Sequence, residues 1–239
     1  MDLGLAGSVV LIVGGSGYIG TEVARQFASE GARVVIAGRD PARLEAAAAK
    51  VGSGVSTRVL DSSSDESVAS AIGWIVNELG RLDVVVDCAA PSARTLDPGR
   101  DADPGQVLQA MEGKPLGYLR VANAALPVMI AAGSGRIVFV SGQNALITGS
   151  VTGSVRNGAV IAISKNLADA YAGTGVTVNT VNPGTVTDEP NPVPTLGKPG
   201  ESTPAQVAAL VVFLASAVAA GVSGESIAVG HRVLGVIGS

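Results

Sequence analysis

Residues 13–20, which read V-G-G-S-G-Y-I-G, have the composition of an anion-binding turn. Glycine lets the backbone turn tightly and approach a ligand, and the free N–H groups at a helix start stabilise negative charge. The turn joins an apolar run, residues 9–13, to a segment with apolar residues at helical spacing. This context favours a dinucleotide diphosphate over a turn that is glycine-rich for packing alone. The candidate cofactor-binding residues here are Gly14, Ser16, Gly17, Tyr18 and Ile19.

The end of the second apolar run, Ala37-Gly38-Arg39-Asp40, bears on the type of cofactor. An acidic residue directly after this strand would accept hydrogen bonds from an adenosine ribose and repel a 2′-phosphate. Here Gly38 leaves room and Arg39 can pair with a phosphate bidentately. The sequence therefore favours NADP(H) over NAD(H). The alternative is that Arg39 faces solvent and pairs with Asp40.

The elements that must position these residues alternate between strands and helices. Apolar runs predict strands over residues 9–13, 33–37, 57–60, 84–86, 136–140, 176–179 and 226–229. Helical spacing predicts helices over residues 19–31, 42–51, 63–79, 104–132 (with Pro115 and Pro127 as possible breaks) and 154–172, and from residue 203 onward. This order predicts an α/β fold, a doubly wound parallel seven-stranded sheet (Rossmann) with helices on both faces. We expect one domain over residues 1–239, with a proline-rich lid loop at about 188–202.

Composition narrows the classes of function. The chain has 239 residues, 47% hydrophobic and 15% charged, with 16 basic and 20 acidic residues and a net charge of −4. This balance argues against a nucleic-acid partner, because phosphate binding normally needs a dense basic patch. One cysteine and one histidine exclude a disulfide and argue against a metal site. No signal peptide or membrane span is expected, since the longest strongly apolar stretch, residues 208–222, is too short. We expect a cytoplasmic protein with a small-molecule substrate.

Taken together, the motifs resemble those of the compact short-chain dehydrogenases/reductases over essentially the full chain. The landmarks are Asp61-Ser62, Asp87-Cys88-Ala89-Ala90, Leu126 to Met129, Asn182-Pro183-Gly184 with Thr187, and Gly224 to Val229. The resemblance implies further cofactor-binding residues at Asp61, Ser62, Ala89, Ala90, Pro183, Gly184, Val186 and Thr187. It also implies a homo-oligomer, a dimer or tetramer. The glycine spacing departs from this branch, because Tyr18 stands where the compact members have their middle glycine.

The active-site positions depart further. The family uses an Asn in the fourth helix, a Ser after the fifth strand and a Tyr-x-x-x-Lys pair, with Tyr as proton donor or acceptor. Ser141 fits the serine, whereas the tyrosine and lysine positions fall on Gly153 and Asn157 and the asparagine position on Lys114. A register ending on Lys165 needs a long deletion and is rejected, and it supplies no tyrosine either.

A substitute acid must therefore come from other side chains. The candidate catalytic residues are Ser141, Ser154, Asn157 and Lys114. A partly buried Lys114 would have a lowered pKa and could act as acid or relay, the alternative being a surface lysine at a helix bend. Ser154 shares a helix face with Asn157, the alternative being a helix N-cap. Arg156 ranks lower because it points about 100° away from Asn157 around the helix.

Two classes of function remain. The first is an NADP(H)-dependent oxidoreductase acting on a carbonyl, alcohol or C=N group with a non-tyrosine acid. The second is a catalytically inactive NADP(H)-binding protein, a sensor or a partner subunit. A cofactor-free lyase similar to the halohydrin dehalogenases is disfavoured, because those proteins keep the tyrosine and lose the nucleotide glycines, the opposite of this chain.

Overall fold

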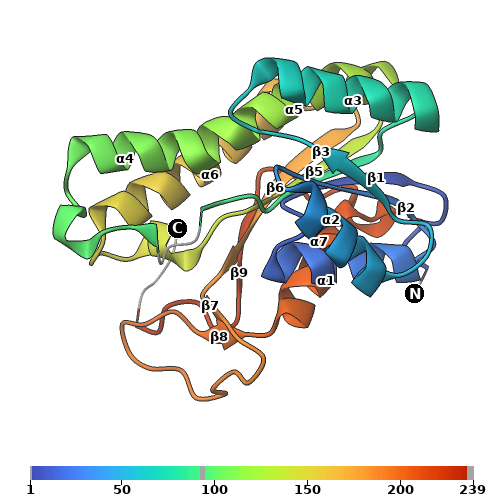
Figure 1. Cartoon of the computed structure of the whole chain (residues 1–239). Helices are drawn as coiled ribbons and strands as arrows, with labels where there is room; N and C mark the ends of the chain where they lie inside the picture. Colours follow the sequence, from blue (N-terminus) through green and yellow to red (C-terminus); the bar gives the residue numbers. More distant parts are fainter. Residues whose placement is uncertain (1, 92–94, 236–239) are drawn as a thin grey trace.

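A computed structural model describes residues 2–91 and 95–235. Its main sheet has seven parallel strands in the order β3-β2-β1-β4-β5-β6-β9 (Figure 1). The strands are β1 (Val9–Val13), β2 (Arg33–Gly38), β3 (Ser56–Val59), β4 (Val84–Asp87), β5 (Gly135–Val140), β6 (Val176–Pro183) and β9 (Ser226–Val229). β1 and β4 are buried along their whole length, as continuous apolar runs require when both faces of a sheet are covered. The predicted parallel seven-stranded fold is confirmed.

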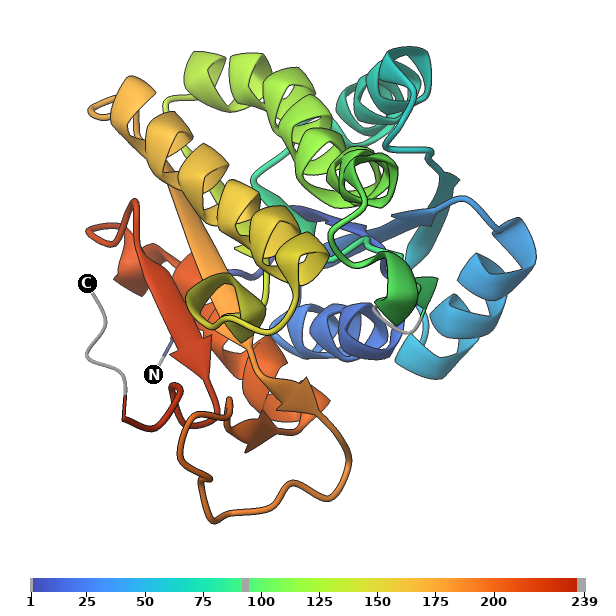
Figure 2. The ribbon, with the colours of Figure 1, turned by 90° about the vertical axis from the view of Figure 1, so that its left-hand side faces the viewer.

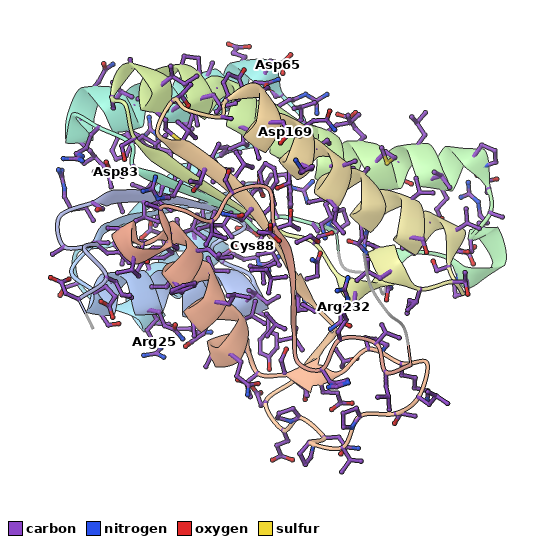
Figure 3. All side chains as sticks on the ribbon, turned by 180° about the vertical axis from the view of Figure 1, so that it is seen from behind. Arg25, Asp65, Asp83, Cys88, Asp169 and Arg232 are labelled. Atoms are coloured by element: carbon purple, nitrogen blue, oxygen red, sulfur yellow. The ribbon has the colours of Figure 1, made fainter. Side chains whose placement is uncertain are left out.

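Helices cover both faces of this sheet (Figures 1 and 2). One layer contains α1 (Tyr18–Ser29), α2 (Pro41–Val51) and α7 (Pro204–Ala215). The other contains α3 (Asp65–Leu79), α5 (Gly117–Ala131) and α6 (Val151–Ala170), and α4 (Pro104–Met111) extends this layer beyond the sheet edge. Each layer buries its own apolar cluster against the sheet. Figure 3 shows Arg25, Asp65 and Asp169 on the outer surface of the helices and Cys88 near the centre of the molecule.

Two helices begin at a different serine from the one expected. α6 is capped by Ser150, whose hydroxyl accepts from the Gly153 amide, so the helix begins three residues before Ser154 and the N-cap alternative for Ser154 is wrong. α3 is capped by Ser64, one residue after the predicted start of this helix at Ser63. The hydroxyl of Ser63 instead donates to Asp61 Oδ1 at 2.7 Å. The Ser150 hydroxyl also donates to Asp101, 49 residues away, whereas Ser63 is held by a local contact with Asp61.

The region from 104 to 132 is interrupted at one proline and not at the other. Residues Glu112–Leu116 form a π-helical turn between α4 and α5 that contains Pro115. Proline has no N–H to donate to the preceding turn, and a local π turn accommodates that loss. Pro127 lies inside α5 without ending it, so this break was wrongly expected.

The proline-rich segment leaves the sheet beyond β6. It is bracketed by two short paired strands, β7 (Thr185–Val186) and β8 (Glu201–Ser202), so the expected loop ends at residue 200 rather than 202. Figure 2 shows it projecting from the body of the fold. Within the described part of the chain, no helix is both long enough and apolar enough to cross a membrane.

Candidate functional site

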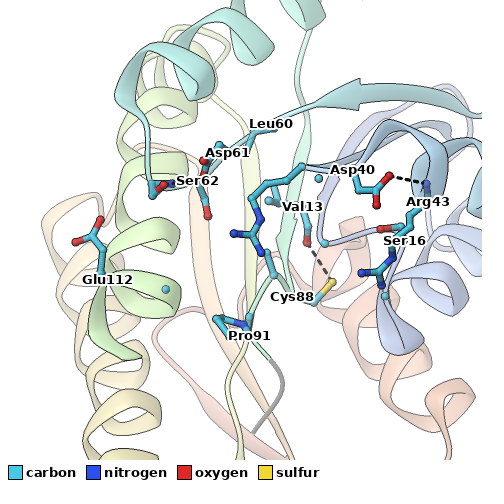
Figure 4. A pocket seen from close by; sticks show the side chains of 18 residues that line it. Val13, Ser16, Asp40, Arg43, Leu60, Asp61, Ser62, Cys88, Pro91 and Glu112 are labelled. Atoms are coloured by element: carbon cyan, nitrogen blue, oxygen red, sulfur yellow. Dashed lines mark hydrogen bonds between the residues drawn. The ribbon is translucent and has the colours of Figure 1, made fainter. Parts of the chain in front are cut away.

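A crevice of about 250 Å³ opens where the strand order reverses, at the carboxyl ends of β1 and β4. Ligands of open α/β sheets bind at such a switch point. Figure 4 shows Asp61, Ser62 and Glu112 on one side of the crevice and Ser16, Asp40 and Arg43 on the other. Eight of the predicted cofactor residues line it: Gly14, Ser16, Gly17, Arg39, Asp61, Ser62, Ala89 and Ala90.

The glycine turn has the shape of a cradle that side chains would fill. Gly14 has φ +80°, and a Cβ there would lie 2.6 Å from the Ala89 backbone nitrogen. A Cβ on Gly20 would lie 2.2 Å from the Gly14 carbonyl oxygen. α1 starts at N-cap Gly17 with no side-chain cap and no acidic residue in its first turn. Its amino-terminal N–H groups and dipole are therefore available to an anion, so the turn fits a dinucleotide diphosphate.

Two arginines stand at the end of β2. Arg39 lines the crevice, and so does Arg43, one helical turn further along the chain in α2. The carboxylate of Asp40 caps α2 by accepting from the Arg43 amide at 3.1 Å. Arg39 is exposed, as its alternative reading expected, but among the described residues it forms no ion pair with Asp40. The sequence reading missed Arg43, although its position one turn after Arg39 is a usable signal.

The carboxyl end of β4 brings two titratable groups to the inner end of the crevice. Asp87 is fully buried, with Oδ1 accepting from the Ala89 amide at 3.0 Å and Oδ2 left without a partner. Burial raises the pKa of Asp87 well above its usual range and so favours the protonated acid. Cys88 Sγ donates to the Val13 carbonyl (Figure 4), and desolvation raises the pKa of this thiol. It is therefore a poor nucleophile.

Three of the four predicted catalytic residues meet beside this end of the crevice. Lys114, in the π-helical turn, is only 4% exposed, so the surface-lysine alternative is wrong. Its Nζ donates to the Ser141 carbonyl at 3.0 Å and to Asn157 Oδ1 at 2.9 Å. Ser141 follows β5, and its hydroxyl donates to the Asn157 carbonyl at 2.9 Å.

The Lys114 ammonium is unusually acidic. Its pKa is lowered to about 7, first by burial and then by repulsion from Arg156, with Asp87 and Cys88 partly opposing the change. The ring of Tyr118, 5.9 Å from Nζ, faces this ammonium. An amine that titrates near neutral pH can give and take a proton under physiological conditions. The Tyr118 hydroxyl donates to the Val140 carbonyl, and burial raises its pKa, so it is no substitute acid.

The structure does not bring Ser154 into this cluster. Its hydroxyl donates to the Ile147 carbonyl at 2.9 Å, and it lines a separate hollow of about 250 Å³ with Asn144, Ser150 and their neighbours. At Gly153, where the tyrosine was expected by register, a Cβ would lie 2.9 Å from Ser150 Oγ, so a side chain there would require Ser150 to shift.

Arg156, ranked below the candidate catalytic residues, lies buried near Lys114. It is 6% exposed, its Nη1 donates to the Pro91 carbonyl at 3.2 Å, and its Nε is buried without a partner. The angle around α6 does separate it from Asn157, but the β4–α4 connection packs against that side of the helix. Arg156 therefore lies close enough to Lys114 to lower its pKa.

The remaining predicted cofactor residues lie outside the crevice wall. They are Tyr18, Ile19, Pro183, Gly184, Val186 and Thr187. Tyr18 is half exposed, and its hydroxyl donates to Asp188 Oδ1 at 2.6 Å, joining α1 to the proline-rich segment. That segment lines its own hollow of about 580 Å³. Thr187 donates its amide to Ser202, which fixes the start of the segment.

Known proteins resemble this chain along most of its length. The family model described as short chain dehydrogenase matches residues 8–191. Subunit BbsC of (2S)-[(R)-hydroxy(phenyl)methyl]succinyl-CoA dehydrogenase from Thauera aromatica is 32% identical over 233 residues, 92% of each chain. Galactitol 2-dehydrogenase (L-tagatose-forming) from Cereibacter sphaeroides is 30% identical over 251 residues, 94% of each chain.

Solved structures agree with this relationship. A short chain dehydrogenase from Bacillus anthracis superposes with a TM-score of 0.84 at 26% identity, covering 96% of each chain. L-sorbose reductase from Gluconobacter frateurii, complexed with NADPH and L-sorbose, has the same fold, with a TM-score of 0.84 at 23% identity over 99% of this chain and 100% of that one. With the crevice at the switch point and the family match over most of its sequence, the chain belongs to the short-chain dehydrogenases, a family of NAD(P)-binding oxidoreductases.

Proposed function

We propose that this chain is an NADP(H)-dependent oxidoreductase acting on a carbonyl, alcohol or C=N group, with Lys114 as the acid in place of tyrosine. The observation that supports this most is the buried Lys114 ammonium, hydrogen-bonded to Ser141 and Asn157. The family resemblance places an asparagine on this helix and a lysine on α6. Here the two residue types have exchanged positions, and their side chains contact each other. The exchange keeps an amine at the site while the tyrosine is lost.

Each residue has a distinct task in this proposal. When bound, NADP(H) supplies or accepts the hydride. Lys114 holds the transferable proton at Nζ, and Asn157 positions that amine through its Oδ1. The Ser141 hydroxyl binds the substrate oxygen once it turns away from the Asn157 carbonyl. A positioned general acid of this kind contributes about 10² to 10⁴ in rate.

The turnover test compares two lysines of the same chain. Purified protein is screened with NADPH against carbonyl and imine compounds, and with NADP⁺ against alcohols. Lys114→Met is expected to lower kcat by about 10² or more. Lys165→Met is the matched control, because Lys165 lies exposed on α6, paired with Asp169, and belongs to the rejected register. If Lys165→Met abolished turnover and Lys114→Met did not, the assignment of the acid would be wrong.

The cofactor preference is proposed from Arg39 and Arg43 in the crevice wall. Charge-assisted hydrogen bonds contribute about 1.5–3 kcal/mol, so Arg39→Gln is expected to weaken NADPH binding by about tenfold or more. NADH binding should stay nearly unchanged, because NADH has no 2′-phosphate. Arg33→Gln, at the other end of β2, is the control. Fluorescence titration of both nucleotides measures these effects, and equal losses for NADPH and NADH would contradict the proposal.

A second candidate is a catalytically inactive NADP(H)-binding protein or partner subunit. It is favoured by Gly153 at the tyrosine position, where Ser150 fills the adjoining space, and by the relative from Thauera aromatica that is named as a subunit. Two results together would support this candidate over the first. The protein would bind NADPH tightly without turnover in any screen, and Ser141→Ala would change only ligand affinity.

Further proposals concern assembly, location and the lid. A homo-oligomer, dimer or tetramer, is supported by the exposed apolar side chains Leu108, Val151 and Val155 on α4 and α6, and light scattering measures it.

The segment from β7 to β8 is proposed to close over the substrate, since Asp188 already joins it to α1 through Tyr18. Cytoplasmic location stays a prediction.

A further inference from the structure

Two buried cations stand beside the inner end of the crevice. Lys114 and Arg156 are 4% and 6% exposed. Among the described residues, neither forms an ion pair with a carboxylate. Their hydrogen bonds run to backbone carbonyls and to one neutral amide, and Arg156 Nε has no partner. Charged groups in such surroundings are normally paired, because taking an unpaired charge out of water costs several kcal/mol.

The two cations border one small region. Arg156 donates to the Pro91 carbonyl. The Pro91 ring packs against Gly113, so closely that a Cβ on Gly113 would lie 3.0 Å from the ring. Gly113 precedes Lys114, whose Nζ reaches Asn157, the residue after Arg156. Pro91 and Gly113 both line the crevice. Lys114 and Arg156 do not themselves line the crevice, but they lie directly behind these two wall residues.

The carboxylates nearby do not neutralise this charge. Asp87 is the only acidic side chain in the buried set of the described residues, and its burial favours the protonated acid. Glu112 lines the crevice, but its carboxylate pairs with Arg120 at 2.6 Å. The Arg156 guanidinium therefore keeps an unpaired positive charge behind this part of the crevice wall, and the Lys114 amine, whose pKa is about 7, adds to that charge when it is protonated.

We propose that Arg156, with Lys114 beside it, binds the carboxylate of the substrate, so that the substrate is a carbonyl or hydroxy acid rather than a neutral sugar or alcohol. This inference rests on the oxidoreductase function proposed above. The cofactor does not supply this anion, because the diphosphate cradle at Gly14 and the arginines after β2 lie at other parts of the crevice. Arg156 suits the task since its planar guanidinium can bind a carboxylate bidentately and one of its N–H groups is unused.

The test is a binding experiment that needs no turnover. Calorimetry measures the affinity of the protein for four acids: pyruvate, acetoacetate, benzoylformate and 2-oxoglutarate. Each acid is compared with its methyl ester or dimethyl ester, with and without saturating NADP⁺. We expect at least one acid to bind at least tenfold more tightly than its ester. Arg156→Gln should remove this preference. Arg136→Gln is the matched control, since Arg136 is a half-buried arginine that donates to the carbonyls of Gly135 and Gly175 at the opposite end of β5.

The outcomes separate this inference from the proposed function. Acid preference that depends on Arg156 supports the carboxylate site, even if no compound is turned over, in which case the oxidoreductase proposal fails alone. Turnover of neutral carbonyls with no acid preference overturns the carboxylate site and leaves the oxidoreductase proposal standing. A third outcome is that sulfate competes for the site as strongly as the carboxylic acids do. That result would mean that the site binds a free inorganic anion, and it would overturn the proposed substrate-carboxylate site. Arg156→Lys keeps the charge without the planar fork, so an intermediate preference is expected even if Arg156→Gln does not fold.

Discussion

Replacing Lys114 with methionine tests the buried amine through stability rather than activity. Methionine has a similar length and no charge, so it fills the same space between Ser141 and Asn157. It removes the two hydrogen bonds that Nζ donates, and leaving a buried acceptor such as Asn157 Oδ1 unpaired costs about 1–3 kcal/mol. It also removes the cost of holding a buried ammonium. The balance of these effects depends on pH.

The sign of that dependence follows from the lowered pKa. The pKa of Lys114 is about 7 in the folded chain against an ordinary 10.5. Between those values the unfolded chain keeps a proton that the folded chain has released, so raising the pH stabilises the folded wild type. Each pH unit contributes about 1.4 kcal/mol, so from pH 7 to pH 9 wild type should gain about 2–3 kcal/mol relative to Lys114→Met. Below pH 7 both states are protonated and the difference levels off.

Urea denaturation of both proteins at pH 6, 7, 8 and 9 measures this difference. The variant carries the other titrating groups, so most of their contribution cancels in the comparison. Lys165→Met, at an exposed lysine, should show no such trend. Parallel stability curves for wild type and Lys114→Met across this range would refute the idea of a neutral-pH amine, and with it the proposed acid.

Two further predictions address the crevice. Gly14→Ala should weaken the binding of either nucleotide by at least about tenfold. Its φ of +80° disfavours alanine, and the added Cβ would lie 2.6 Å from the Ala89 nitrogen. Calorimetry measures the affinity, and an unchanged value would contradict the proposed diphosphate cradle. Tyr18→Phe removes the exposed hydrogen bond to Asp188 and should change the free energy of unfolding by less than about 0.5 kcal/mol. It should nevertheless raise the dissociation rate of NADPH, measured by stopped flow. An unchanged rate would mean that this contact does not retain the cofactor.

The sequence predicted the features that depend on short segments. Continuous apolar runs specify strands buried on both faces, and their alternation with helices specifies the parallel sheet. The glycine turn was readable because the residues that make it are adjacent. Arg39 directly follows β2 and Asp61 comes two residues after β3, so their place at the carboxyl edge of the sheet follows from the topology.

Features that depend on packing between distant elements were not readable. The side of α6 that carries Arg156 could have faced solvent, and its burial depends on elements distant in sequence, among them Pro91, whose carbonyl accepts from Arg156. The contact between Tyr18 and Asp188 joins residues 170 positions apart. The start of α6 at Ser150 involves Asp101, which accepts from the Ser150 hydroxyl and the Val151 amide across about 50 residues of sequence.

In the register proposed above, a tyrosine introduced at Gly153 is not expected to restore the usual site on its own. At Gly153 a Cβ would already lie 2.9 Å from Ser150 Oγ, and Ser150 must stay where it is because it caps α6. The Asn157 Oδ1 accepts a hydrogen bond from the Lys114 amine, which belongs to the π-helical turn. A lysine at position 157 would therefore place a second positive charge beside the Lys114 ammonium. Position 114 therefore constrains position 157, and the cap constrains position 153. In the proposed mechanism the proton therefore comes from the amine of the π-helical turn.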